Sequence, residues 1–216
     1  PADLRASLGL LPDEKPRVCY LSLANDVARV QQYWVSGEND PRSQKATFAG
    51  MFFDVVKALD AEGLLLSTFP TEPPTDQAVT IAAVPLEAGQ GHHEIPIELI
   101  VDRLAQFDPH LVMISPSLPL EIIPEIAAKF TTVYYAHSLF WPCDWDSVAL
   151  PLKARLKRFV RTRRARAKLK NVKAVMAPSE VCLRQFPTLV KRDIPSFICE
   201  RQFYQEPQTA SEHRPS

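Results

Sequence analysis

The chain has 216 residues, with 25 lysine and arginine residues balanced by 25 aspartate and glutamate residues, 46% hydrophobic residues, four cysteines and six glycines. Such a chain can bury the core of one compact domain but is too short for two full α/β domains, and it holds no apolar run near the roughly 18 residues of a membrane-spanning helix. The cysteines lack the CxxC spacing of zinc sites and glycine is too scarce for a glycine-rich phosphate loop, so we expect a cytoplasmic protein with neither a cofactor nor a bound metal.

The first expected strand covers residues 17–24 and follows a polar leader over residues 1–16. It is an apolar run without alternation, which is typical of a strand buried on both faces. Residues 25–43 are polar and contain Gly37 and Pro41. We therefore expect a long loop there, and loops of this length in compact domains are often functional.

An amphipathic helix is expected over residues 46–62, because its apolar residues recur every three or four positions, and Gly63 is expected to cap it. Further strands are expected over residues 64–69, 79–84, 111–115, 132–136, 172–177 and 195–199, and further helices over residues 97–107, 152–170 and 180–189. A short helix is expected to begin between residues 119 and 124 and to end near residue 130. The helix marked by the apolar residues from Ile97 to Phe107 is expected to include Pro96 in its first turn and to stop at Asp108-Pro109.

This alternation of strands and helices predicts an α/β fold with a doubly wound, mostly parallel sheet covered on both faces. Ligands of such sheets bind beyond the carboxyl ends of the strands, where the strand order reverses. The segments that follow four expected strands therefore become the candidate binding site. Its candidate ligand-contacting residues are Asn25, Asp26, Ser115, Ser117, Ser138, Trp141, Trp145, Ser179 and Glu180.

His137 directly follows the strand over residues 132–136, where an imidazole can exchange a proton with a ligand. A histidine that caps the strand or borders the core explains the same position equally well. Trp141 and Trp145 alternate with Asp144 and Asp146, a combination of aromatic faces and carboxylates that suits a sugar or a cationic group. Aromatic residues that simply pack on the core are the alternative.

Two other polar groups have simpler structural explanations. Ser179 is suited to cap a helix and Glu180 to occupy its first turn, although a helix N-terminus at this edge can also bind an anion. His92, His93 and Glu94 are neighbours whose side chains point apart, so they do not form a metal site.

Residues 153–173 carry eleven basic residues and no acidic one, which leaves 14 basic against 25 acidic residues in the rest of the chain. Leu152, Leu156, Phe159 and Val160 lie at helical spacing there, so we expect a helix with one apolar seam. An anionic membrane surface ranks first as its partner, another protein second and nucleic acid third. The residues expected to hold the anionic surface are Lys157, Arg158, Arg161, Arg164 and Lys168.

Four strings occur in a fixed order along the chain: RVCYLSLA over residues 17–24, FAGMFFDVVKAL over 48–59, DPHLV over 108–112 and VMAPSE over 175–180. In this order they resemble the N-terminal half of glycosyltransferases built from two Rossmann-like domains, the GT-B type. The chain is most similar to the retaining family-four group, over about residues 17–199. The resemblance implies one Rossmann-like N-terminal domain over residues 17–199. The polar composition of the end of the chain predicts a linker or disordered tail over residues 200–216.

The resemblance also implies a division of labour. The N-terminal domain binds the acceptor and places a histidine after a strand, which His137 matches, while a C-terminal domain outside this chain binds the nucleotide sugar. The chain departs from the family pattern after the first strand, where Asn25 and Asp26 replace the usual glycines. We therefore expect the acceptor-binding domain of an enzyme that moves a sugar from a nucleotide-sugar donor to a glycan or lipid-linked acceptor, inactive on its own.

In this hypothesis His137 lines the reaction centre, and the donor-binding domain is supplied in cis or as a separate subunit. A non-catalytic scaffold is the alternative. It would dock through the helix over residues 152–170 on an anionic membrane or on a partner subunit, which would place the protein at the inner face of the membrane.

Overall fold

A computed structural model gives the fold of the chain. It describes residues 10–11, 13–23, 27–36, 46–69, 78–86, 90–91, 94–114, 121–136, 151–177, 179–190 and 193–198.

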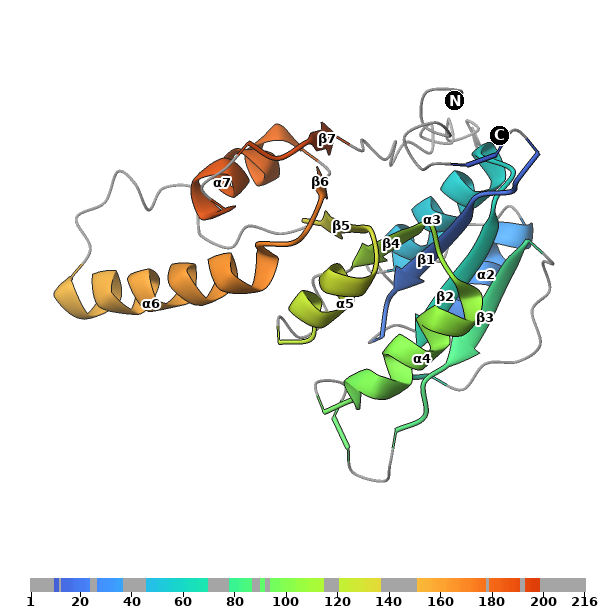
Figure 1. The fold of residues 1–216 in the computed structure, drawn as a ribbon, viewed down its shortest axis with the longest axis horizontal. Coiled ribbons are helices and arrows are strands. Elements are labelled where there is room, and N and C mark those ends of the chain that lie inside the picture. Colours follow the sequence, from blue (N-terminus) through green and yellow to red (C-terminus); the bar gives the residue numbers. More distant parts are fainter. Residues whose placement is uncertain are drawn as a thin grey trace, which may run out of the picture.

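The described residues form a parallel sheet of seven strands (Figure 1). The strands are β1 (Arg17–Leu21), β2 (Glu62–Ser67), β3 (Val79–Ala83), β4 (Leu111–Ile114), β5 (Thr132–Tyr135), β6 (Ala174–Ala177) and β7 (Ser196–Ile198). Their order is β3-β2-β1-β4-β5-β6-β7, so the chain builds outward from β1 to one edge and then returns to build outward from β4 to the other. The predicted α/β, doubly wound fold is confirmed, and every strand pairing in it is parallel.

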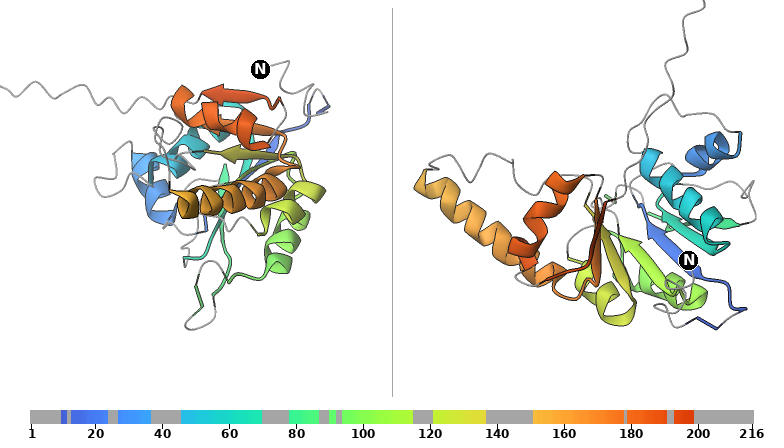
Figure 2. Two further views of the ribbon diagram at one scale, coloured as in Figure 1. Left: turned by 90° about the vertical axis from the view of Figure 1, so that its left-hand side faces the viewer. Right: turned by 90° about the horizontal axis from the view of Figure 1, so that it is seen from above.

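Helices cover both faces of the sheet (Figure 2). They are α2 (Val27–Ser36), α3 (Ala46–Ala58), α4 (Ile97–Phe107), α5 (Ile123–Lys129), α6 (Leu152–Leu169) and α7 (Glu180–Val190). Residues of α2 and α3 share one buried cluster with the sheet, and residues of α4, α5, α6 and α7 share the other.

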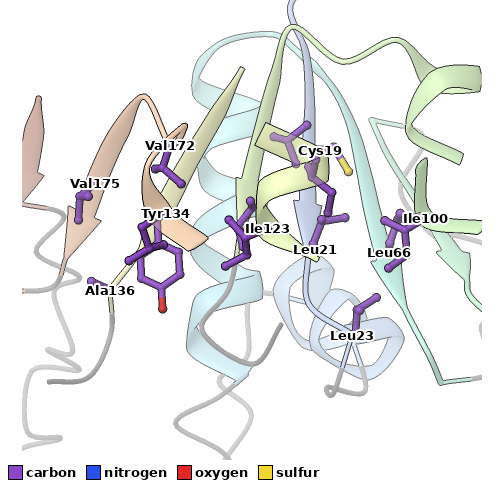
Figure 3. Packing of buried hydrophobic residues seen from close by; sticks show 14 of the residues in the cluster. Cys19, Leu21, Leu23, Leu66, Ile100, Ile123, Tyr134, Ala136, Val172 and Val175 are labelled. Carbon is purple, nitrogen blue, oxygen red and sulfur yellow. The ribbon is translucent and has the colours of Figure 1, made fainter. Parts of the chain in front are cut away.

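Side chains of β1 alternate between these two clusters, as the pleat of a strand requires. Cys19 and Leu21 belong to the cluster with α4 and α5, and Val18 and Tyr20 to the cluster with α2 and α3. All four are at most 1% exposed. Figure 3 shows the cluster that includes residues of α4 and α5, with Cys19 and Leu21 beside residues of neighbouring elements. Burial on both faces explains why the strand reads as an unbroken apolar run.

The expected loop over residues 25–43 is wrong in its middle, because Val27–Ser36 forms α2. Polar residues that the sequence places on this segment are held by tertiary contacts. Gln31 is 2% exposed, and its side-chain amide donates to the carbonyl of Val79 at 3.2 Å. The indole N–H of Trp34 donates to Asp54 on α3 at 2.8 Å. Together with the burial of Val27 and Val30 in the cluster shared with α3, these hydrogen bonds hold α2 in place.

The expected end of the next helix is also wrong. Helix α3 ends at Ala58 rather than at residue 62, and Asp60, with φ of 47°, takes the left-handed conformation expected of Gly63. Gly63 lies within β2, where its missing side chain leaves room for Val56 and Val79. Pro96 is the N-cap of α4 instead of lying in its first turn, whereas Asp108 ends that helix as predicted, with φ of 51°.

We predict that Gly63→Ala destabilises the protein. A Cβ at this position would lie 2.8 Å from Cγ2 of Val56 and 3.0 Å from Cγ2 of Val79. Such overpacking costs about 1–3 kcal/mol, and the lower entropy of the unfolded alanine chain offsets only about 0.4–1 kcal/mol. Denaturant unfolding should show a net loss of roughly 1–2 kcal/mol.

Val56→Ala supplies the matched test, because it removes the methyl group nearest to the added Cβ. The double variant should then be less destabilised than the sum of the two single variants. Additive effects would contradict a steric origin.

Candidate functional site

The strand order brings the carboxyl ends of β1, β4, β5 and β6 side by side along one edge of the sheet. The candidate residues follow these strands in the sequence: Ser115 comes directly after β4, and His137 comes two residues after the end of β5. The candidate residues outside the described part of the chain are Asn25, Asp26, Ser115, Ser117, His137, Ser138, Trp141 and Trp145. Their roles stay predictions.

The last described residues before these segments form an apolar floor, which we define as Leu23, Ile114, Ala136 and Ala177. Each is at most 1% exposed. Figure 3 shows Leu23 and Ala136 beyond the ends of β1 and β5. The floor continues the hydrogen bonding of the sheet, since the backbone N–H of Ala136 donates to the carbonyl of Met176 at 2.7 Å. Because the floor offers no charged side chain, polar contacts with a ligand must come from the segments that follow the strands.

Three buried hydroxyl residues at this edge were missed by the sequence reasoning: Ser22, Ser67 and Thr68. The backbone N–H and the hydroxyl of Thr68 both donate to the carbonyl of Leu23, and the hydroxyl oxygen of Ser67 accepts the backbone N–H of Phe69. The two bonds from Thr68 hold the segment after β1 against the end of β2, just before Asn25 and Asp26 in the sequence. Their signal in the sequence is a small polar residue at the end of an apolar run.

Ser179 is the candidate whose structural role is visible. Its hydroxyl oxygen accepts the backbone N–H of Cys182 at 3.4 Å, so it caps α7 as the sequence indicates. Glu180 is exposed and pairs with Arg184 at 3.2 Å, one turn further along the helix. Both residues thus stabilise the start of α7, next to the carboxyl end of β6.

The candidate basic residues lie together on α6. Lys157, Arg161 and Arg164 are exposed, and Lys168 is half-buried with its ammonium group 3.7 Å from Glu121. The side chain of Arg158 lies outside the described residues.

The opposite, amino edge of the sheet carries a charged cluster, which we call the amino-edge cluster: Glu14, Arg17, Asp108 and His110. The guanidinium of Arg17 donates to Asp108 at 2.8 Å and to Glu14 at 3.3 Å. The backbone N–H of Arg17 donates to Nδ1 of His110 at 3.0 Å, which assigns the ring proton to Nε2, 3.0 Å from Glu14. Since it lies at the wrong edge for a ligand, we interpret this cluster as a structural clamp between β1 and β4.

Two other kinds of function find no support in the described part of the chain. Its histidine, cysteine, aspartate and glutamate residues form no group of three that could hold a metal ion. Among the helices given above, none is long and apolar enough to cross a bilayer.

Comparison with known proteins shows likeness at the level of structure. No protein-family model and no curated protein matches the sequence. A solved structure of sucrose-phosphate synthase from Thermosynechococcus elongatus matches with a TM-score of 0.58 and 13% identity, over 86% of this chain and 48% of that one. A second structure of the same enzyme gives a TM-score of 0.46 and 12% identity, over 85% and 88%.

This chain has a glycosyltransferase-like α/β fold. The likeness covers 86% of the chain, and the chain spans about half the length of the first matched structure. At 13% identity the likeness concerns the fold.

We predict that Glu14→Gln weakens the fold in a pH-dependent way. The backbone N–H of Leu11, followed by His110 and Arg17, holds the pKa of Glu14 below its ordinary value of 4.5, against an opposing effect of partial burial. Ionised Glu14 therefore stabilises the fold above that value, and the contribution is lost as the pH falls through the folded-state pKa. Denaturant unfolding should separate wild type from variant near neutral pH, and the difference should shrink as the pH falls below 4.5 and through the folded-state pKa of Glu14.

Asp13→Asn is the matched control for this prediction, since Asp13 is an exposed acid beside Glu14. It should leave the pH dependence unchanged. A gap between wild type and Glu14→Gln that stays constant with pH would contradict the clamp.

We also predict that Ser179→Ala lowers the free energy of unfolding by about 1 kcal/mol or less, because it removes the cap of α7. Ser179→Asp should retain wild-type stability, since a carboxylate accepts the same N–H and is favourable at a helix N-terminus. Equal stability of the alanine variant and the wild type would contradict the capping role.

Proposed function

We propose that this chain is the acceptor-binding N-terminal domain of a GT-B glycosyltransferase related to the retaining family-four group. One observation carries the proposal: the doubly wound sheet resembles that of sucrose-phosphate synthase over 86% of this chain but only 48% of that enzyme. A partial match of this kind supports a domain that works together with a second one. The domain that binds the nucleotide sugar would be supplied in cis or as a separate subunit.

The arrangement of strand ends supports a site at the carboxyl edge. The order β1-β4-β5-β6 makes neighbours of the strands that precede Asn25, Ser115, His137 and Ser179. The apolar floor closes the sheet beneath them, so a polar acceptor would lie on these segments rather than between the strands. Trp141 and Trp145 would stack against the acceptor, and hydroxyl groups of the same segments would bind its polar atoms.

Sugar transfer forms a bond between an acceptor oxygen and the anomeric carbon, breaks the bond from that carbon to the donor diphosphate, and releases the acceptor proton. We propose that His137 lines this reaction centre, where an imidazole can receive a proton or bind a hydroxyl group. Stabilisation of the departing diphosphate falls to the donor-binding domain. The lack of glycines after β1 supports this division, because that segment is not built for close approach of backbone to phosphate.

We predict that the 216-residue chain alone transfers no sugar and shows no change in melting temperature with nucleotide sugars. In the proposed enzyme this domain positions the acceptor. Without a bound donor, positioning the acceptor cannot lower the activation barrier of sugar transfer. A thermal-shift screen and a transfer assay with a panel of nucleotide sugars would test this. Sugar transfer by the chain alone would contradict the proposal.

The active assembly supplies the positive test. His137→Ala there should lower the rate of transfer by a factor of about 10²–10⁴, as loss of a general base does. Arg103→Ala, on the exposed side of α4, is the matched control and should leave the rate unchanged. Equal rates for His137→Ala and wild type would remove His137 from the reaction centre.

A further inference from the structure

Helix α6 is much longer than the strands that it connects. Its 18 residues span about 27 Å, whereas the four residues of β5 span about 13 Å. A helix between two parallel strands must run back from the carboxyl edge to the amino edge, and α6 reaches the amino edge at its C-terminal end, just before β6. Its N-terminal half projects away from the rest of the described domain, as Figure 1 and Figure 2 show for the orange helix.

The two halves of α6 differ in burial. Ala165 and Leu169 in the C-terminal half are 3% and 1% exposed and belong to the core cluster shared with α5 and α7. The apolar residues of the N-terminal half face solvent instead. Their exposed fractions are 82% for Leu152, 63% for Leu156, 63% for Phe159 and 40% for Val160. We call these four residues the outward row.

The outward row is not an extension of the core face. At 3.6 residues per turn its four residues fall within about 100° of the helix circumference, roughly opposite to Ala165 and Leu169. An apolar stripe of this width is what a helix buries against a partner. The predicted single apolar seam is therefore wrong: α6 has one apolar face toward the core and a second one toward solvent.

Positive charge borders the outward row on both sides. Lys153, Lys157 and Arg164 lie along one side and Arg155 along the other, and all four are exposed. The sequence contains no acidic residue between Asp146 and Glu180. Long basic side chains beside an apolar stripe can reach the headgroups of a lipid layer while the stripe enters its apolar boundary.

We propose that the outward row of α6 docks this protein on an anionic lipid bilayer. A second copy of the chain would bring two strongly positive helices together, which their mutual repulsion opposes. Nucleic acid would engage the basic residues but would leave the apolar row exposed. An anionic bilayer satisfies both features at once, because it buries the row and attracts each basic residue.

The inference goes beyond the proposed sugar transfer and rests on α6 alone. Vesicle binding requires no sugar or donor domain, so failure of one proposal leaves the other intact.

Flotation of the 216-residue chain with phosphatidylcholine vesicles, with and without an equal part of phosphatidylserine, tests the docking. We expect binding to the anionic vesicles only, weakened by salt. Lys153→Gln/Lys157→Gln/Arg164→Gln should lower the affinity about fivefold for each removed charge, or roughly 100-fold in total. Leu152→Gln/Leu156→Gln/Phe159→Gln keeps every charge and should lower it more than tenfold, because it removes the buried apolar area.

Matched controls change the same kinds of residue elsewhere on the surface. Val35→Gln/Val181→Gln alters two exposed apolar residues of other helices, and Arg103→Gln/Lys173→Gln alters two exposed charges off the row. Both should bind like wild type. Far-UV circular dichroism checks that all variants keep their helix content, which glutamine favours.

Several results would overturn the proposal. They are failure of the wild type to bind anionic vesicles, equal binding to neutral ones, or undiminished binding of the variant that lacks the apolar row. Tight binding of the wild type to duplex nucleic acid or to an acidic protein, without vesicle binding, would assign α6 to that partner instead.

Discussion

The burial of β1 on both faces and both edges is the constraint on which the rest of the structure depends. Its neighbours β2 and β4 supply the backbone pairing, and two helical layers receive its alternate side chains, Cys19 and Leu21 on one face and Val18 and Tyr20 on the other. In this chain, β2 and β3 extend the sheet on one side of β1, and β4 to β7 extend it on the other. The strand order therefore reverses between β1 and β4, which is where ligands of doubly wound sheets bind.

Strands buried on both faces were predictable because an unbroken apolar run is a local signal. It can be recognised without knowing which distant residues the strand contacts. Helix α2 was not, because Gln31 and Trp34 are satisfied by Val79 and Asp54, which lie far away in the sequence. Gly63 shows the same limit: its position after the predicted helix suggested a cap, but in the structure its missing side chain leaves space for Val56 and Val79. Where the role of a residue depends on a partner far away in the sequence, the local sequence pattern does not predict that role.

The location of the candidate site could be derived from strand order, but the residues that shape its base could not. Thr68 fastens the end of β1 through two bonds to Leu23, and no spacing in the sequence links these positions. The DPHLV string over residues 108–112 carried part of the resemblance to glycosyltransferases. Its residues Asp108 and His110 nevertheless belong to the amino-edge cluster, away from the candidate site. A string can thus identify a fold through residues that hold the sheet together.

Helix α6 sets a final constraint, because the fold needs only part of it. About nine helical residues match the length of a four-residue strand, so about nine more are in excess of what the crossover requires. Packing on the sheet gives no reason for those residues to be apolar, and a solvated extension would carry acidic residues for pairing along the helix. Leu152, Leu156 and Phe159 are instead exposed, and the residues beside them are basic with no acidic residue among them. Exposed apolar area in a contiguous row marks an interaction surface, so the excess length of α6 is best explained by a contact outside the domain.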